Sequence, residues 1–86
     1  MDNLKPGDKL PNGTTLMILG RLPDRVGNLP GAIVMAYDDK GKQFATWMYV
    51  DDPKGAYCTT GWYRKDVEDA LRDYHFRLRR LEKFSA

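Results

Sequence analysis

The chain has 86 residues, of which 42% are hydrophobic and 30% charged, and it contains two Trp, five Tyr and three Phe. This composition excludes a disordered chain, and the length leaves room for one modest core, so we expect a single domain over residues 1–86. The net charge of +2 is too small to indicate a class of partner, and the single cysteine, Cys58, excludes an internal disulfide framework.

The apolar runs are too short to span a bilayer, and the N-terminal residues lack the pattern of a secretory signal. We therefore expect a soluble, cytoplasmic protein with no membrane partner.

The first half of the chain predicts turns followed by two strands. Turn residues occur at 5–8 (KPGD) and 11–13 (PNG), so the first dozen residues should be extended pieces joined by tight turns. Residues 15–22 (TLMILGRL) are strand-like, with Gly20 marking a bulge or a close approach of another segment. Residues 23–31 are rich in Pro and Gly and predict a loop, and the short apolar run 32–37 (AIVMAY) predicts a buried strand.

The second half predicts a hairpin, a fourth strand and a helix. Residues 38–41 (DDKG) read as a hairpin turn whose Gly41 suits a positive φ, and 43–50 (QFATWMYV) as the returning strand. Residues 51–55 (DDPKG) form another turn before the strand 56–63 (AYCTTGWY). Residues 66–83 (DVEDALRDYHFRLRRLEK) predict a helix with Asp66 as its N-cap and one apolar stripe made of Val67, Ala70, Leu71, Tyr74, Leu78 and Leu81.

This order predicts an α+β fold, namely a four-stranded antiparallel meander with one C-terminal helix packed across it. A curled, SH3-like half-barrel is the alternative. One helix covers one face of a sheet, so the other face must be solvated, curled on itself or covered by a partner.

Phe76 is the most informative residue, because at about 100° per residue it falls opposite the apolar stripe of the helix. A phenylalanine outside the docking face, surrounded by cations, indicates a surface that contacts something else. We therefore predict a partner-binding surface formed by Phe76, Arg72, Arg79, Arg80 and Lys83. The charge order along the helix, acidic residues first and basic residues last, also complements the helix dipole, so helix stability alone explains part of it.

Two other surfaces are possible. The cations Arg72, Arg77, Arg79, Arg80 and Lys83 could bind nucleic acid, with Phe76 stacking on a base. The aromatic residues Trp47, Tyr49 and Trp62 could form a second surface, although most of the aromatic residues fit a structural core better.

Catalysis is poorly supported by the sequence. His75 is the one histidine and lies at the edge of the apolar stripe, and Cys58 lies in a predicted strand without a histidine near it in sequence. The pairs Asp38–Asp39 and Asp51–Asp52 fit ordinary turns and lack the spacing of a calcium loop. We expect no metal site, no cofactor and no enzymatic activity.

Three short patterns carry a resemblance: A-T-W-x-Y at 45–49, G-W-Y at 61–63 and A-L-x-D-Y-x-x-R at 70–77, together with K-P-G-D and L-P-N-G near the start. With these the chain resembles small uncharacterised proteins of phages, plasmids and other mobile elements. The resemblance implies a genomic setting and brings no activity or functional residue with it.

The sequence thus predicts a non-enzymatic binding module that uses its C-terminal helix to contact another protein or a second copy of itself. A nucleic-acid-binding protein is the alternative. We also expect a homodimer, because one sheet face lacks cover and because Phe76 and Phe84 point outward. An antiparallel helix pair would set Asp69 and Asp73 of one chain beside Arg79 and Arg80 of the other.

Overall fold

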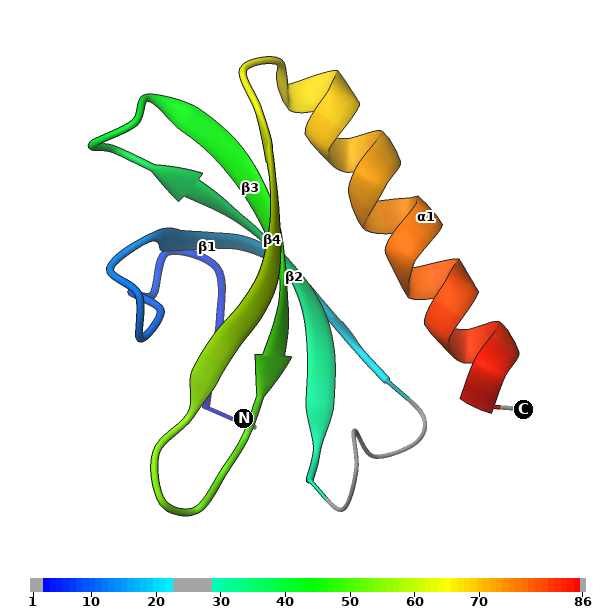
Figure 1. Cartoon of the computed structure of the whole chain (residues 1–86). Coiled ribbons are helices and arrows are strands. Elements are labelled where there is room, and N and C mark those ends of the chain that lie inside the picture. Colours follow the sequence, from blue (N-terminus) through cyan, green and yellow to red (C-terminus); the bar gives the residue numbers. More distant parts are fainter. Residues whose placement is uncertain (1–2, 23–28, 86) are drawn as a thin grey trace.

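The computed structural model describes residues 3–22 and 29–85, with side chains up to residue 80. Four strands are followed by one helix (Figure 1): β1 (Thr15–Arg21), β2 (Gly31–Asp38), β3 (Gln43–Val50), β4 (Tyr57–Arg64) and α1 (Val67–Ser85). The predicted α+β meander is confirmed, since the sheet is open, antiparallel and ordered β1-β2-β3-β4. Most of the predicted loop at 23–31 lies outside the described residues.

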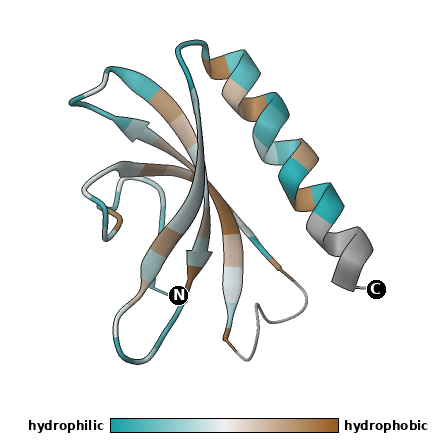
Figure 2. Cartoon of the chain, in the orientation of Figure 1, coloured by the Kyte–Doolittle hydropathy of each residue, from teal (hydrophilic) through white to brown (hydrophobic). Residues whose placement is uncertain are grey.

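The sheet is built on a central hairpin of β2 and β3, which pair without interruption from Gly31↔Val50 to Asp38↔Gln43. Hydrophobic residues follow one another along β2 (Figure 2), and six successive residues of this strand are buried, because successive side chains point to opposite faces and both faces are covered. The β3–β4 pairing shifts between Thr46 and Met48. Two residues of β4, Thr60 and Gly61, there lie opposite one residue of β3, which is a β-bulge. Thr60 has a φ of +55°.

The helix packs across one face of the sheet and contacts β2, β3 and β4 (Figure 1). Asp66 caps it as predicted, since its Oδ1 accepts a hydrogen bond of 2.7 Å from the backbone N–H of Glu68. Ala70 and Tyr74 are buried against Ile33 and Met35 of β2. Gly20 marks the predicted close approach, because a Cβ there would lie 2.5 Å from the Tyr74 hydroxyl.

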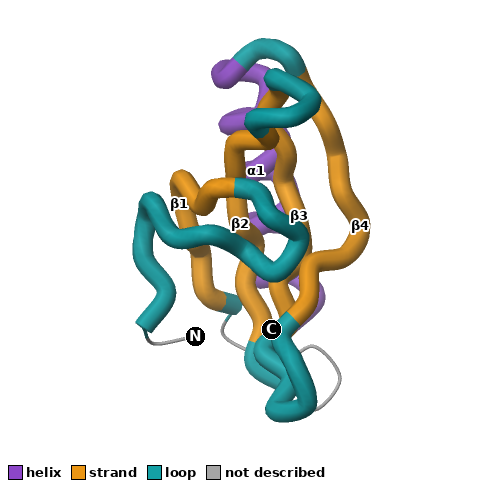
Figure 3. The backbone as a smooth tube through the Cα atoms, turned by 90° about the vertical axis from the view of Figure 1, so that its left-hand side faces the viewer, coloured by secondary structure: helices purple, strands orange, loops and turns teal. Residues whose placement is uncertain are grey.

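The N-terminal segment covers the other face of the sheet, which the sequence left without an assigned cover. Residues 3–14 run beside β1 and across the face opposite the helix (Figure 3). The backbone N–H of Gly7 donates to Leu16 O, and that of Leu16 donates to Asp8 O, both at 2.8 Å. Leu10, 3% exposed, joins Leu16, Val34 and neighbouring residues in a second core cluster. The expectation that this face is short of cover is therefore wrong.

Two local predictions are corrected. Gly41 does not supply the positive φ of the β2–β3 turn, because Lys42 does, with a φ of 49°. Val67, placed on the apolar stripe, is 37% exposed, so the buried face of the helix begins at Ala70. Leu81, Lys83 and Phe84 lie outside the described side chains. No helix among the described residues is long and apolar enough to cross a membrane.

Candidate functional site

The seam between β4 and α1 contains a buried cation, Arg77. This arginine is 6% exposed, and its Nη1 donates to the backbone oxygen of Thr46 at 2.8 Å and to the Thr46 hydroxyl at 3.0 Å. Its guanidinium carbon lies 4.4 Å from the ring centroid of Trp62, within the range of a cation–π interaction. Burial lowers the pKa of Arg77, while the carboxylate of Asp73 acts in the opposite direction. Arg77 therefore joins helix to sheet and does not belong to the exposed basic face.

A second link between β4 and α1 fixes the helix beside this seam. Arg64, at the end of β4, donates from Nε to Asp73 Oδ2 at 2.8 Å and from Nη2 to Oδ1 at 3.3 Å. This two-pronged geometry suits the planar guanidinium. The hydrogen bond and charge of Asp73 raise the pKa of Arg64. The carboxylate of Asp73 is thus fully engaged by β4.

Phe76 is exposed, as the helical spacing predicts, and it is the most exposed large hydrophobic residue among those described, at 54%. It does not stand alone, however. Its ring lies beside the indole of Trp62, with the two centroids 6.2 Å apart and the planes at 34°. Two aromatic groups from different elements, β4 and α1, are therefore adjacent on this side of the molecule.

Next to this pair is a shallow depression, which we call the notch, with a volume of about 120 Å³. It is lined by Met48, Trp62, Arg77 and Arg80. Met48 and Trp62 supply apolar walls, and the exposed lining of the notch is almost wholly apolar. Met48 comes from β3, Trp62 from β4 and the arginines from α1, so the notch exists only in the folded protein.

The other predicted cations have different surroundings. Arg72 is exposed and donates from Nη1 to Asp69 Oδ1 at 3.0 Å, one helical turn away. Arg79 and Arg80 are both exposed, and Arg80 also reaches the notch. We call Trp62, Phe76, Arg72, Arg79 and Arg80 together the helix surface.

The second surface predicted from Trp47, Tyr49 and Trp62 is not formed. Trp62 faces the helix, whereas Trp47 and Tyr49 lie on the opposite face with the second core cluster. Tyr49 is 6% exposed and packs in that cluster. Trp47 contacts the ring of Tyr63 edge-on, with centroids 5.3 Å apart. The bulge at Thr60 and Gly61 adds one residue between Cys58 and Trp62. The side chains of Cys58 and Trp62 therefore point to opposite faces of the sheet, although strict alternation along β4 would place both on the same face.

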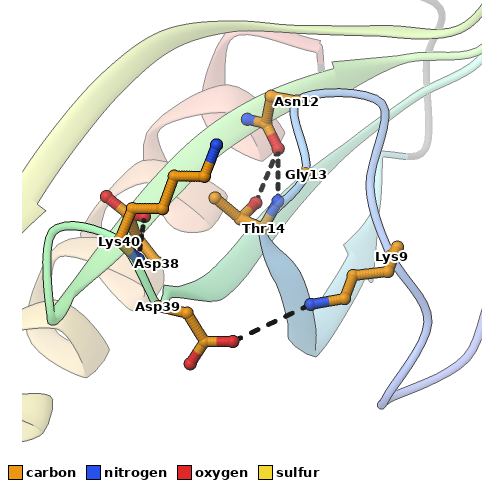
Figure 4. A pocket seen from close by; sticks show the side chains of 7 residues that line it. All are labelled: Lys9, Asn12, Gly13, Thr14, Asp38, Asp39 and Lys40. Carbon is orange, nitrogen blue, oxygen red and sulfur yellow. Dashed lines mark hydrogen bonds and ion pairs between the residues drawn. The ribbon is translucent and has the colours of Figure 1, made fainter.

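A polar pocket of about 210 Å³ lies between the N-terminal segment and the β2–β3 turn (Figure 4). The Asn12 side chain accepts from the backbone N–H and the hydroxyl of Thr14, and Asp38 accepts from the backbone N–H of Lys40. Lys9 and Asp39 face each other at 3.9 Å, and both are exposed. These contacts stabilise the two turns, and an exposed ion pair of this kind contributes little. We assign no ligand to this pocket.

Among the described residues, Cys58 and His75 have separate surroundings. Burial raises the pKa of Cys58 to about 11, so the thiol is protonated at neutral pH and a poor nucleophile. His75 is exposed, and its ring lies edge-on to Tyr74 with centroids 5.1 Å apart. In the part of the chain that the structure describes, no three His, Cys, Asp or Glu residues come together as metal ligands.

Two members of the candidate site were missed by the sequence reasoning. Met48 was not proposed as a site residue, and Arg77 was assigned to the cations that could bind nucleic acid. The spacing of Trp62, four residues before the helix N-cap, is the one signal that could have placed it near the helix. Nothing in the sequence indicated that the indole lies beside Phe76.

Comparison with known proteins found no family model, no curated protein and no solved structure that matches this chain. The resemblance to small mobile-element proteins accordingly stays a prediction, and a function has to be argued from the surface of this chain.

Proposed function

We propose that this protein is a non-enzymatic binding module that engages a partner protein through the helix surface. The observation that carries the proposal is Phe76, which is 54% exposed and lies on Trp62. Leaving an aromatic ring half in water forfeits part of its transfer free energy, at roughly 25 cal/mol for each Å² of apolar area. A partner that covers the ring recovers it.

The composition of the helix surface also supports a protein partner. Trp and Arg are the residues most enriched at the energetic centres of protein interfaces, and such centres combine a well-packed aromatic anchor with a polar rim. Trp62 and Phe76 provide the anchor here, and Arg72, Arg79 and Arg80 surround it. The Arg64–Asp73 and Arg77–Thr46 contacts hold the helix in place, so little order has to be gained on binding.

Binding of nucleic acid is the alternative function, and the exposed cations of the helix favour it. Two observations weigh against it: Arg77 is buried in the seam, and Arg72 is already paired with Asp69. Fluorescence anisotropy with mixed single-stranded and double-stranded oligonucleotides tests it. Affinity that falls steeply with added salt would support nucleic-acid binding, because phosphate contacts release counterions.

Affinity capture from a lysate of the native host, with Phe76→Ala compared with the wild type, tests the proposal. Val67→Ala is a matched control, because Val67 is also an exposed hydrophobic residue of α1. We expect a protein retained by the wild type and by Val67→Ala but lost with Phe76→Ala. Equal retention by all three proteins would contradict the proposal.

A homodimer through the same surface is also a proposal, but two of the arguments for it from the sequence are weakened by the structure. The sheet face that was expected to need a partner is covered by residues 3–14 of the same chain. Asp69 and Asp73 were expected to pair with arginines of a second copy. Both carboxylates already bind arginines of their own chain, so these contacts would have to break first. Light scattering at high micromolar concentration distinguishes the 9.9 kDa monomer from twice that mass.

A role as an accessory protein of a mobile element is a further part of this proposal, supported by the resemblance of the short aromatic patterns. The genes that neighbour the coding sequence test it, since mobile-element genes beside it would support the role.

A further inference from the structure

The sheet face opposite the helix is covered by a segment that buries few of its own side chains. Residues 3–14, which we call the strap, run beside β1 and across this face (Figure 3). Within the strap Leu10 and Thr14 are buried, and every other residue is at least partly exposed. Segments with few buried apolar contacts are the ones that open at the lowest free energy, so the strap is weakly held by packing.

The hydrogen bonds between the strap and β1 are also few. The backbone N–H of Gly7 donates to Leu16 O, and that of Leu16 donates to Asp8 O, both at 2.8 Å. Lys9 Nζ donates to the Thr15 hydroxyl at 2.9 Å, but this contact is exposed. Among the described residues, the other backbone hydrogen bonds of the strap close turns inside it. They hold the strap together without joining it to the sheet.

Trp47 adds a cost to the closed arrangement. Its indole nitrogen, Nε1, is buried, and no acceptor among the described residues is within hydrogen-bond distance. A donor that is buried without an acceptor loses its hydrogen bond to water and gains none, which destabilises the folded state. Trp47 packs against the second core cluster, to which Leu10 belongs and against which Leu4 also packs. The strap and Trp47 thus meet at the same cluster.

The rest of the fold is held by contacts that do not involve the strap. β2 pairs with β1 on one side and with β3 on the other. The helix is joined to β4 by Arg64 and Asp73, and to β3 by Arg77 and Thr46. The strap can therefore leave the sheet without breaking any of these contacts.

We propose that the strap opens as a unit while the four strands and the helix stay folded, and that this opening controls access to the apolar surface of Leu16, Val34 and Tyr49. Transfer of Leu10 back to water opposes the opening, whereas hydration of the Trp47 indole N–H favours it. The inference goes beyond the proposed function and is independent of it, because it concerns the sheet face opposite the helix.

Native-state hydrogen exchange of the ¹⁵N-labelled full chain, followed by NMR at low urea concentrations, tests the inference. The Gly7 and Leu16 amides report on the strap, because their hydrogen bonds join it to β1. The amides of β2 that pair with β3 report on global unfolding. The Trp47 indole N–H is a third reporter, because burial alone protects it.

In the wild type, we expect the two strap amides and the Trp47 indole N–H to exchange at least tenfold faster than the β2 amides, after correction for intrinsic rates. Their rates should also depend less on urea, because opening the strap exposes less surface than unfolding the chain.

Two variants separate opening of the strap from unfolding. Leu10→Ala weakens the closed state and should accelerate all reporters by roughly 30-fold or more. Ile33→Val is the control, because Ile33 is fully buried in the cluster beneath the helix, which stays folded when the strap opens. It should accelerate the β2 amides severalfold and change the Gly7 and Leu16 amides less than twofold. The wild type and Ile33→Val decide the matter even if Leu10→Ala does not fold.

Equal exchange of the strap and β2 amides, with the same dependence on urea, would overturn the inference, because the chain would then open as one unit. An equal acceleration of all reporters in Ile33→Val would overturn it for the same reason. If the strap amides exchange early but the Trp47 indole N–H follows the β2 amides, the strap does not uncover Trp47, and the assigned role of its indole is wrong.

Discussion

Gly61 is a position where the structure leaves no room for a side chain. It lies in the bulge of β4, directly beneath the indole of Trp47. A Cβ added at Gly61 would lie 2.3 Å from Cζ3 of Trp47, 2.7 Å from Cη2 and 2.8 Å from Cε3. Carbon atoms in contact are normally about 3.5–4.0 Å apart, so in Gly61→Ala the ring has to move by more than ~1 Å.

That movement is expensive because Trp47 is held on several sides. Its ring contacts Tyr63 edge-on and packs against the second core cluster. Adding one methyl group to a well-packed site typically costs about 1–3 kcal/mol, and the rigid indole places Gly61→Ala in the upper half of that range. For a domain of this size, we expect the Tm to fall by about 8–20 °C.

A double-mutant cycle separates the clash from other effects of the added methyl group. Free energies of unfolding from urea denaturation are compared for the wild type, Gly61→Ala, Trp47→Leu and the double variant. The leucine removes the atoms that collide, so the alanine should cost at least 1 kcal/mol less in that background. If Gly61→Ala loses less than about 0.5 kcal/mol, or loses the same amount in both backgrounds, the assigned contact is wrong.

Three further predictions concern single sites. Thr60→Asn should raise the free energy of unfolding by about 0.5–1 kcal/mol, because Thr60 has a φ of +55° and asparagine adopts this region more readily than a β-branched residue. The free energy is measured by thermal unfolding, and a decrease of about 0.5–1 kcal/mol would refute this. Stability should fall as pH rises from about 9 to 11, since burial raises the pKa of Cys58 to about 11 and the unfolded chain then releases this proton first; Cys58→Ala should reduce that decline, and an unchanged slope would contradict the assignment. Phe76→Ala should lose only about 0.5–1 kcal/mol, the value of an exposed aromatic contact with Trp62, and a loss of the 3–5 kcal/mol seen for buried phenylalanines would place Phe76 in the core.

The strands and the helix could be predicted from the sequence because their signals are local. Turn residues at 38–41 and 51–55 separate apolar runs of strand length, and Asp66 precedes a clear helical period. The structure places all four strands within one or two residues of the predicted limits. The exposure of Phe76 was predictable for the same reason, since it depends only on spacing along one helix.

The candidate site was only partly predictable because it depends on how the elements pack. The helix lies on the sheet with its buried centre rotated toward Arg77, away from Val67. A long arginine side chain can enter a seam and use its donors there, which a count of charges does not reveal. The β-bulge at Thr60 and Gly61 places Trp62 on the opposite face of the sheet from Trp47 and Tyr49. No residue pattern in β4 predicted this bulge.

The cover of the second sheet face was unpredictable for a related reason. The sequence of residues 3–14 predicts only turns. In the structure this segment covers the sheet through the side chain of Leu10 and through backbone hydrogen bonds to β1, which are tertiary contacts. Sequence patterns rank local conformations and do not show which face a turn-rich segment reaches.

The proposed function requires a partner protein that binds at Phe76 and Trp62. The affinity of the captured partner, measured by isothermal titration calorimetry with wild type, Phe76→Ala and Val67→Ala, tests it most directly. We expect a Kd at least tenfold weaker for Phe76→Ala, equivalent to about 1.4 kcal/mol, and a change of less than twofold for Val67→Ala. Equal affinities of Phe76→Ala and the wild type would contradict it.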